Sequence, residues 1–290
     1  MITRRGFLCS IGALAFGTAG DAHFLEPHWL ELRRYRLESG ATPGQRAVQL
    51  LHLADLHASW AVSLDYIAEA IEFGLQARPD VICVTGDFIT HQYDRFGPYG
   101  RILSRLSSAA PTFACLGNHD GGKWSSKYWG YKSTAPVSAL LRRSGIELLF
   151  NRCASLRIGG RNIQIIGLGD WWAGGLDPER AFEEARGGTG SPGSGRAGTE
   201  KPFRIVLSHN PDTKVFLAQY EWDLLLSGHT HGGQFYMPLI GAPFAPVKDK
   251  RFIDGMYEWN NRKIHITKGV GNVWGLRLNC RPDVSLITIG

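Results

Sequence analysis

The sequence AVQLLHLADLH at residues 47–57 decides the fold class, because it joins a buried strand to a group of polar side chains. Residues 48–54 form a largely apolar run of strand length, and Asp55-Leu56-His57 follows it directly. Apolar runs that alternate with amphipathic helices are typical of α/β layered proteins, which place functional residues at the carboxyl ends of their strands. We therefore expect a functional site immediately after residue 54.

Four further blocks repeat this arrangement of an apolar strand followed by polar residues. They end in Gly86-Asp87, Gly117-Asn118-His119-Asp120, Ser208-His209-Asn210 and Gly228-His229-Thr230-His231, after expected strands at 80–85, 112–116, 203–207 and 223–226. Helices are expected at 62–77, 101–110 and 135–144, and further strands at 146–150, 153–158, 162–168, 252–259, 263–267 and 283–289. The pattern predicts an α/β fold that becomes richer in strands toward its end.

Three local segments complete the expected organisation. Residues 31–38 and 47–54 alternate as a β-hairpin would, although residues 29–37 also allow a basic amphipathic helix lying on a membrane. Asn260-Asn261-Arg262 is predicted to be a hairpin turn. Residues 187–199 contain six glycines and predict a flexible loop. Because the polar blocks lie on both sides of that loop, we expect a single domain over residues 23–290.

The composition excludes several classes of protein. With 43% hydrophobic and 20% charged residues, the chain is not a disordered protein. It has no uncharged apolar run of about 20 residues, so it is not a membrane protein of several spans. The net charge of +6 favours anionic partners such as phosphates or acidic lipids. The basic residues are scattered along the chain rather than gathered in one stripe, so no specific nucleic-acid partner is expected. Among the five cysteines, Cys83 and Cys115 are expected in the core, while Cys153 and Cys280 are left open as a disulfide pair.

The first residues have the features of an export signal. Thr3-Arg4-Arg5-Gly6-Phe7-Leu8 precedes an uncharged segment at 9–19, a pattern that resembles the twin-arginine signal. We expect residues 1–22 to be this signal, with cleavage after Ala19 or Ala22. The protein would use the twin-arginine export machinery and act in the periplasm or cell envelope. An uncleaved signal that keeps it in peripheral contact with the membrane stays open, as does an ordinary exposed tail.

The five polar blocks supply the donor atoms of a metal site. Carboxylate oxygens and imidazole nitrogens suit divalent ions such as Mn, Fe, Zn or Ni. On extended chain, an Asp-x-His or His-x-His spacing would point both side chains the same way, and a neighbouring glycine lets the backbone turn. A lone strand-end Asp is usually a helix cap, so the indication comes from the whole ordered set. One carboxylate could bridge two ions about 3.5–4 Å apart.

This order of blocks resembles the calcineurin-like metallophosphoesterases, and within them the exported phosphodiesterases of the YaeI and YkuE type. The resemblance extends from Thr3 to Ile289 and includes Glu26-Pro27 and the residues at 208–212, 228–234, 243–247 and 276–282. It implies a central β-sandwich flanked by helices, in α/β/β/α layers. It also implies two-metal hydrolysis of a phosphodiester by a metal-bridging hydroxide, with manganese the favoured ion.

The resemblance further assigns a role to each polar residue. It implies that Asp55, His57 and His231 bind one ion, that Asn118, His209 and His229 bind the other, and that Asp87 bridges both. It also implies that His119 contacts the phosphate and helps to protonate the leaving oxygen. From its position next to His119, rather than from the resemblance, we expect Asp120 to orient that side chain.

Two alternatives to this function remain open. Relatives in the superfamily act as UDP-2,3-diacylglucosamine pyrophosphatases on a lipid A precursor, so that activity is kept as an alternative. Whether the phosphodiester substrate is lipid-linked, nucleotide-linked or neither is left open. A non-catalytic binding scaffold on the same fold would predict eroded ligands, and none is eroded. Trp171-Trp172, Trp124 and Trp129 follow strand ends closely. They would either contact a base or acyl chains or be core anchors.

Overall fold

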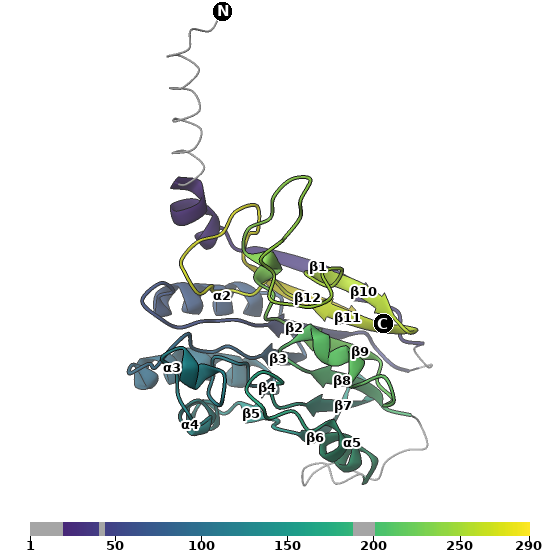
Figure 1. Cartoon of the computed structure of the whole chain (residues 1–290). Coiled ribbons are helices and arrows are strands. Elements are labelled where there is room, and N and C mark those ends of the chain that lie inside the picture. The colour runs from purple at the N-terminus through teal and green to yellow at the C-terminus, as the bar shows by residue number, and fades with distance from the viewer. Residues whose placement is uncertain (1–19, 41–43, 188–200) are drawn as a thin grey trace, which may run out of the picture.

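The computed structural model describes residues 20–40, 44–187 and 201–290 and contains two six-stranded sheets packed face to face (Figure 1). The first sheet has the order β1 (Glu31–Leu37), β12 (Asp283–Ile289), β2 (Val48–Leu53), β3 (Val81–Thr85), β4 (Thr112–Cys115) and β5 (Glu147–Leu148). The second has the order β10 (Gly255–Trp259), β11 (Arg262–Ile266), β9 (Leu224–Ser227), β8 (Phe203–Leu207), β7 (Arg161–Gly167) and β6 (Arg152–Ile158).

Helices cover the outer faces of the two sheets. The first sheet packs against α2 (Leu64–Leu75), α3 (Phe96–Ala109) and α4 (Ala135–Arg143), and the second against α5 (Pro178–Gly187). Short π- or 3-10 turns occur at η1 (Asp21–Leu25), η2 (Glu26–His28), η3 (Ser125–Lys127), η4 (Pro211–Val215) and η5 (His231–Gly233). The predicted α/β class and the α/β/β/α sandwich are therefore confirmed.

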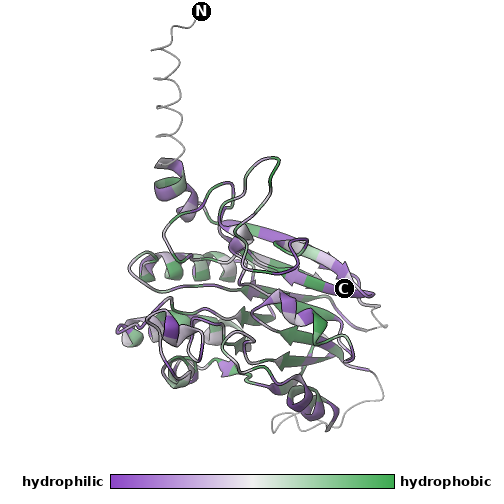
Figure 2. Cartoon of the chain, viewed as in Figure 1, coloured by the Kyte–Doolittle hydropathy of each residue, from purple (hydrophilic) through white to green (hydrophobic). Residues whose placement is uncertain are grey.

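Each central strand is apolar on both faces because each face packs against a different core. In β2, Leu50 points into the core between the sheets, whereas Leu51 and Leu53 contact the helices. Figure 2 shows the hydrophobic colour concentrated on the central strands, with hydrophilic residues on the outer helix faces. Burial on both faces explains why these strands read as nearly continuous apolar runs.

The cysteines occupy separate places in this architecture. Cys83 and Cys115 lie in the core between the sheets, as expected. Cys153 lies on β6 of the second sheet and packs in the core beneath α5. The thiol of Cys280 donates a hydrogen bond to the carbonyl of His231 at 2.9 Å. Cys153 and Cys280 are both free, so the open question of a disulfide between them is answered in the negative.

The expected hairpin between residues 31–38 and 47–54 is wrong in its pairing, although both strands exist. β12 lies between β1 and β2, parallel to β1 and antiparallel to β2. The alternation correctly indicated strands, but it cannot reveal that a strand from the end of the chain inserts between them. The alternative of a membrane-bound helix at 29–37 is also excluded, since β1 occupies most of it. The turn at Asn260-Asn261 is confirmed, with positive φ at both asparagines, as a two-residue hairpin requires.

Two helices differ from expectation. α3 begins at Phe96 rather than residue 101, because Gly97, Pro98 and Gly100 resemble loop sequence but lie in or near the first turn, where proline is tolerated. α5 was not expected, because only Ala181, Phe182 and Ala185 mark its buried face among charged residues.

The signal segment predicted for residues 1–22 and the loop predicted for 187–199 fall largely outside the described residues. Both stay predictions, as does the single domain over 23–290. Within the described ranges, no helix has the length and apolar character needed to cross a membrane.

Candidate metal centre

All eight residues expected in the site converge at the carboxyl ends of five strands. Asp55 and His57 follow β2, Asp87 follows β3, Asn118 and His119 follow β4, His209 follows β8, and His229 and His231 follow β9. Each of these side chains is buried. The strands come from both sheets, so the site forms where the polar ends of the two sheets meet.

The backbone conformation that brings these side chains together was not predicted from the sequence. Five of the eight lie in the left-handed region, at Asp55 (φ 52°), His57 (φ 49°), Asp87 (φ 54°), His229 (φ 69°) and His231 (φ 50°). Non-glycine residues seldom adopt this conformation, and such residues concentrate at functional sites. The expectation that extended chain points Asp55 and His57 the same way is therefore wrong. Left-handed turns aim them into one site.

Two glycines beside the site act through close approach rather than through a turn. A Cβ atom at Gly117 would overlap the Asp87 carboxylate, and one at Gly228 would overlap the Asp55 carboxylate. Neither glycine has a positive φ. Their missing side chains leave the space that the two carboxylates fill.

The donor atoms fall into three overlapping groups, each with its atoms within 4.8 Å of one another. The groups are Asp55, His57 and His231; His57, Asp87 and His119; and Asp87, His209 and His229. Asp87 lies between the histidines of different groups. Its Oδ2 is 3.5 Å from His57 Nε2 and 3.1 Å from His209 Nε2.

The chemistry of this donor set fits divalent cations. His209 donates through Nδ1 to the Thr85 carbonyl at 2.7 Å, which leaves Nε2 directed toward Asp87. Such an outer partner is typical of a metal-binding histidine. Asn118 Oδ1 is buried and has no hydrogen-bond partner in the described part of the chain. Burial of so many nitrogen and carboxylate donors is costly unless a cation or a hydrogen bond compensates for it.

The protonation states of three site histidines agree with metal binding. Burial lowers the pKa of His57, His229 and His231, the last to about 3, so these imidazoles are neutral near pH 7, the form that binds metals. Burial also opposes a charge on His209, but the neighbouring carboxylates of Asp87, Asp55 and Asp170 together outweigh it and raise the pKa of His209 above its ordinary value. Burial raises the pKa of Asp55 to about 7.

His119 is oriented by Thr90 and not by Asp120. Its Nδ1 donates to the Thr90 carbonyl at 2.7 Å, and its backbone N–H donates to Asp87 Oδ1 at 2.9 Å. The Asp120 carboxylate instead accepts the backbone N–H groups of Gly117 and Asp87, at 2.8 and 2.9 Å. The expected role of Asp120 is therefore corrected. It fixes the loops that carry Asp87 and Asn118.

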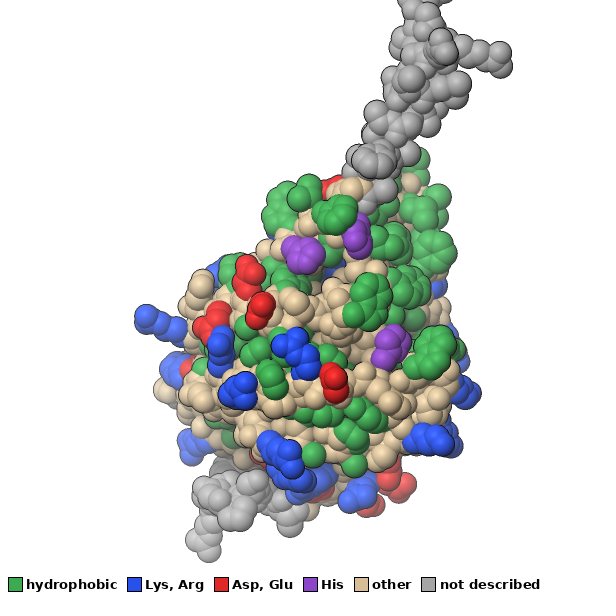
Figure 3. Space-filling model, turned by 90° about the vertical axis from the view of Figure 1, so that its left-hand side faces the viewer, with side chains coloured by type: hydrophobic (Ala, Val, Ile, Leu, Met, Phe, Trp, Pro, Cys, Tyr) green, Lys and Arg blue, Asp and Glu red, His purple; other side chains and the backbone are tan. Residues whose placement is uncertain are grey.

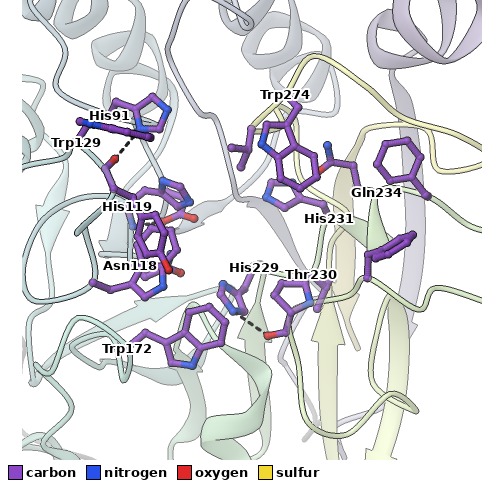
Figure 4. Close-up of a pocket in the computed structure, with 18 of the residues that line it drawn as sticks. His91, Asn118, His119, Trp129, Trp172, His229, Thr230, His231, Gln234 and Trp274 are labelled. Atoms are coloured by element: carbon purple, nitrogen blue, oxygen red, sulfur yellow. Dashed lines mark hydrogen bonds between the residues drawn. The ribbon is translucent and has the colours of Figure 1, made fainter. Parts of the chain in front are cut away.

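An aromatic cavity of about 520 Å³ opens onto these residues (Figure 4). Figure 4 shows Asn118 and His119 on one side of it and His229 and His231 on the other, with Trp172 and Trp274 at its edges. The Trp172 ring lies 4.4 Å from that of His229. Of the four tryptophans left open in the sequence, Trp124, Trp129 and Trp172 line this cavity, whereas Trp171 contacts Phe216 outside it.

Three residues near the site were not assigned from the sequence. Thr90 contacts two site histidines, because its hydroxyl also lies 3.0 Å from His57 Nδ1. His91 lines the cavity. Asp170 is buried, has one carboxylate oxygen without a described partner, and has its pKa raised by burial to about 6. Asp170 lies three residues past the end of β7, so the strand-end signal used for the other blocks applies to it too.

Comparisons with known proteins agree with this geometry. The family model described as calcineurin-like phosphoesterase matches residues 48–233. The chain is 39% identical to the phosphodiesterase YaeI of Escherichia coli, with full coverage of both chains (100% each). It is 31% identical to the metallophosphoesterase YkuE of Bacillus subtilis, over 99% of this chain and 98% of that one.

A more distant relative has a named lipid substrate. The chain is 25% identical to the UDP-2,3-diacylglucosamine pyrophosphatase LpxG of Chlamydia muridarum, over 92% of this chain and 91% of that one. The matched family model contains all five strand-end blocks, and the YaeI relative covers the chain from end to end. The chain therefore belongs to the calcineurin-like phosphoesterase family and is a metal-dependent phosphoric ester hydrolase.

Proposed function

We propose that the protein hydrolyses phosphodiesters at a centre of two divalent metal ions bridged by Asp87. The observation that carries this proposal is the position of Asp87 Oδ2, 3.5 Å from His57 Nε2 and 3.1 Å from His209 Nε2. A carboxylate between two sets of imidazole nitrogens is suited to bind an ion on each side. Asp55, His57 and His231 would hold one ion, and Asn118, His209 and His229 the other.

The bound ions would polarise the phosphoryl group and supply a water of lowered pKa. The protein's own contribution is to fix the donor atoms and to handle the proton of the leaving group. The Thr85 carbonyl holds His209 through its other ring nitrogen, so the ligand has one orientation. Asp120 holds the backbone of Asp87 and Gly117, so the bridging carboxylate and Asn118 keep their spacing.

His119 is proposed to be the proton donor. Its Nδ1 is engaged by the Thr90 carbonyl, which leaves Nε2 as the nitrogen available to the substrate. His119 lines the cavity beside Trp124, whose ring centroid lies 4.4 Å from its own. Its membership of a donor group with His57 and Asp87 allows it to bind metal instead, and metal analysis of a His119 variant distinguishes these roles.

The diester preference is supported by the relative YaeI, which is a phosphodiesterase. The aromatic walls of the cavity also favour substrates with an apolar or aromatic ester group, such as a lipid or a nucleotide. Because the relative LpxG is a UDP-2,3-diacylglucosamine pyrophosphatase, a lipid-linked pyrophosphate is a second candidate substrate. Manganese is the proposed metal, followed by iron, zinc and nickel, which the same nitrogen and oxygen donors accommodate.

We also propose export by the twin-arginine route, supported by the Thr3-Arg4-Arg5-Gly6-Phe7-Leu8 sequence. The protein would then act in the periplasm or cell envelope.

The test of the proposed function is metal reconstitution followed by hydrolysis of paired substrates. The protein is stripped with a chelator, reloaded with each candidate ion, and assayed on a chromogenic phosphodiester and the matching monoester. We expect activity to return with two ions per chain and to be higher on the diester. Full activity in the stripped protein would contradict metal dependence. Higher activity on the monoester would contradict the proposed substrate class.

A further inference from the structure

Large apolar side chains are exposed on two loops and on η1, and two of them, Phe244 and Trp274, also line the cavity. Leu239 and Ile240 form the tip of the loop at 235–247, and Trp274 lies in the loop at 272–276. We refer to the exposed residues Phe24, Leu25, Leu239, Ile240, Phe244 and Trp274 as the apolar platform. Figure 3 shows hydrophobic side chains gathered on the upper part of this face of the molecule.

Hydrogen bonds tie the three segments of the apolar platform together. On η1, a ring nitrogen of His23 lies 3.2 Å from the Gly275 carbonyl, and the Ala22 carbonyl accepts the backbone N–H of Arg277 at 2.9 Å. The loop at 235–247 joins the same segment, because the Tyr236 N–H donates to the Leu278 carbonyl at 2.8 Å. Both loops rise beside η1 in Figure 1. The apolar platform is therefore one surface.

The loop at 235–247 holds its apolar tip outward. Met237 and Gly241 exchange two backbone hydrogen bonds of 2.8 Å that close the tip. Ala242, Ala245 and Val247 form a small core of their own beneath it. Leu239 is consequently fully exposed, with a relative accessibility of 107%. Contiguous exposed apolar residues on a rigid support mark an interaction surface.

The sequence that precedes η1 indicates which kind of partner covers the apolar platform. Residues 6–20 are fifteen uncharged residues rich in apolar side chains, and they lead directly into η1. This stretch is shorter than the roughly 20 residues that a membrane span needs, and its length suits a position at a lipid surface. Ala22 is buried, and its carbonyl accepts the Arg277 N–H. We therefore take the alternative in which the export signal is not cleaved, so that the apolar stretch precedes η1 in the mature chain.

We propose that the apolar platform rests on a lipid bilayer, with the cavity opening toward it. Phe244 and Trp274 belong both to the apolar platform and to the cavity wall, so apolar surface is continuous from the bilayer to the metal donors. The second part of the proposal rests on the proposed function. The substrate would be a phosphodiester whose one ester group is an apolar chain held in the membrane, while its phosphate reaches Asp87 and His119.

The first test places a dye at the tip of the loop. A Leu239→Cys variant, with Cys9→Ser to remove the cysteine outside the described residues, is labelled with an environment-sensitive dye, since the other four cysteines are buried. A matched variant carries the label at Val215, an exposed aliphatic residue on η4. Vesicles of phosphatidylethanolamine and phosphatidylglycerol are then added to the full-length chain.

We expect the dye at position 239 to shift to an apolar emission and the dye at 215 to remain aqueous. Vesicle binding with an aqueous signal at position 239 would show that only the N-terminal segment touches lipid, and it would overturn the proposal. Equal shifts at both positions would overturn it as well, since they would indicate unspecific adsorption.

The second test is vesicle flotation of a Leu239→Ser/Ile240→Ser variant. Removing two aliphatic side chains that would enter the bilayer should lower the vesicle-bound to free ratio by about tenfold or more. Hydrolysis of a soluble chromogenic phosphodiester should not change, because neither residue lines the cavity. Unchanged flotation would overturn the proposal. A fall in oligomeric mass with no vesicle binding by the wild type would assign the surface to a second copy instead, and also overturn it.

Both binding measurements are independent of hydrolysis. A protein that binds vesicles through the apolar platform but hydrolyses no phosphodiester would refute the proposed function and leave the membrane surface standing.

Discussion

Replacement of His119 by alanine should affect hydrolysis according to the leaving group of the substrate. A proton donor matters most when the leaving oxygen is a basic alkoxide, and little when it departs as a nitrophenolate. The structure predicts that the variant keeps its metal donors in place. The His119 backbone N–H that donates to Asp87 Oδ1 is retained in alanine, and Asp120 continues to hold the Asp87 loop.

The expected loss on an alkyl phosphodiester is about 10²–10⁴-fold, or about 3–5 kcal/mol of transition-state stabilisation. On a nitrophenyl diester we expect a clearly smaller loss, which reports only contacts with the phosphate. The variant also loses the bond from Nδ1 to the buried Thr90 carbonyl, so the free energy of unfolding should fall by about 1–3 kcal/mol. That fall leaves a folded protein to assay.

The assay is the ratio of variant to wild-type rate on both substrates at one pH, with metal content measured on the same samples. Burial lowers the pKa of His119, so its protonated form increases as the pH falls below about 6.5. The ratio on the alkyl diester should therefore change more with pH than the ratio on the nitrophenyl diester. Equal losses on both substrates would refute proton donation. The loss of one metal ion per chain would show that His119 is a ligand.

Three further outcomes follow from the structure. Gly228→Ala should reduce the metal content measured by elemental analysis, because its Cβ would overlap the Asp55 carboxylate. Gly97→Ala in α3 is the control: its Cβ would meet open space, so the metal content should not change. Replacing the arginines at residues 4–5 by lysine should leave the precursor in the cytoplasm, as cell fractionation would show; normal export would exclude the twin-arginine route. Burial lowers the pKa of His52 to about 3, so below about pH 6.5 the unfolded chain binds more protons than the folded chain, and the free energy of unfolding should fall as the pH drops. Replacing both His52 and its hydrogen-bond partner His265 by leucine should flatten that pH dependence, as measured by denaturant titrations at several pH values.

The site could be predicted from the sequence because each of its residues lies within four positions of the end of an apolar strand. The run before Asp55 and the run before His229 both carry the signature of a strand buried on two faces. Parallel strands place such ends at one edge, so local patterns were sufficient to assemble a distant group of side chains.

The remaining features depend on contacts that no local pattern records. The insertion of β12 between β1 and β2 joins chain ends that are far apart in sequence. The left-handed backbone at His57 is imposed by the surrounding site, not by the residue type. The aromatic cavity combines Trp172 and Trp274 from separate loops, and its character appears only when those loops are folded.

The central claim, a two-metal centre that depends on one shared carboxylate, is tested most directly by elemental analysis of Asp87→Ala beside the wild type. Asp65→Ala is the matched control, because Asp65 is exposed on α2 and belongs to none of the three donor groups. The account predicts two ions per chain in the wild type and in Asp65→Ala, and loss of both ions together with nearly all hydrolysis in Asp87→Ala. Near-normal metal content in Asp87→Ala would contradict it.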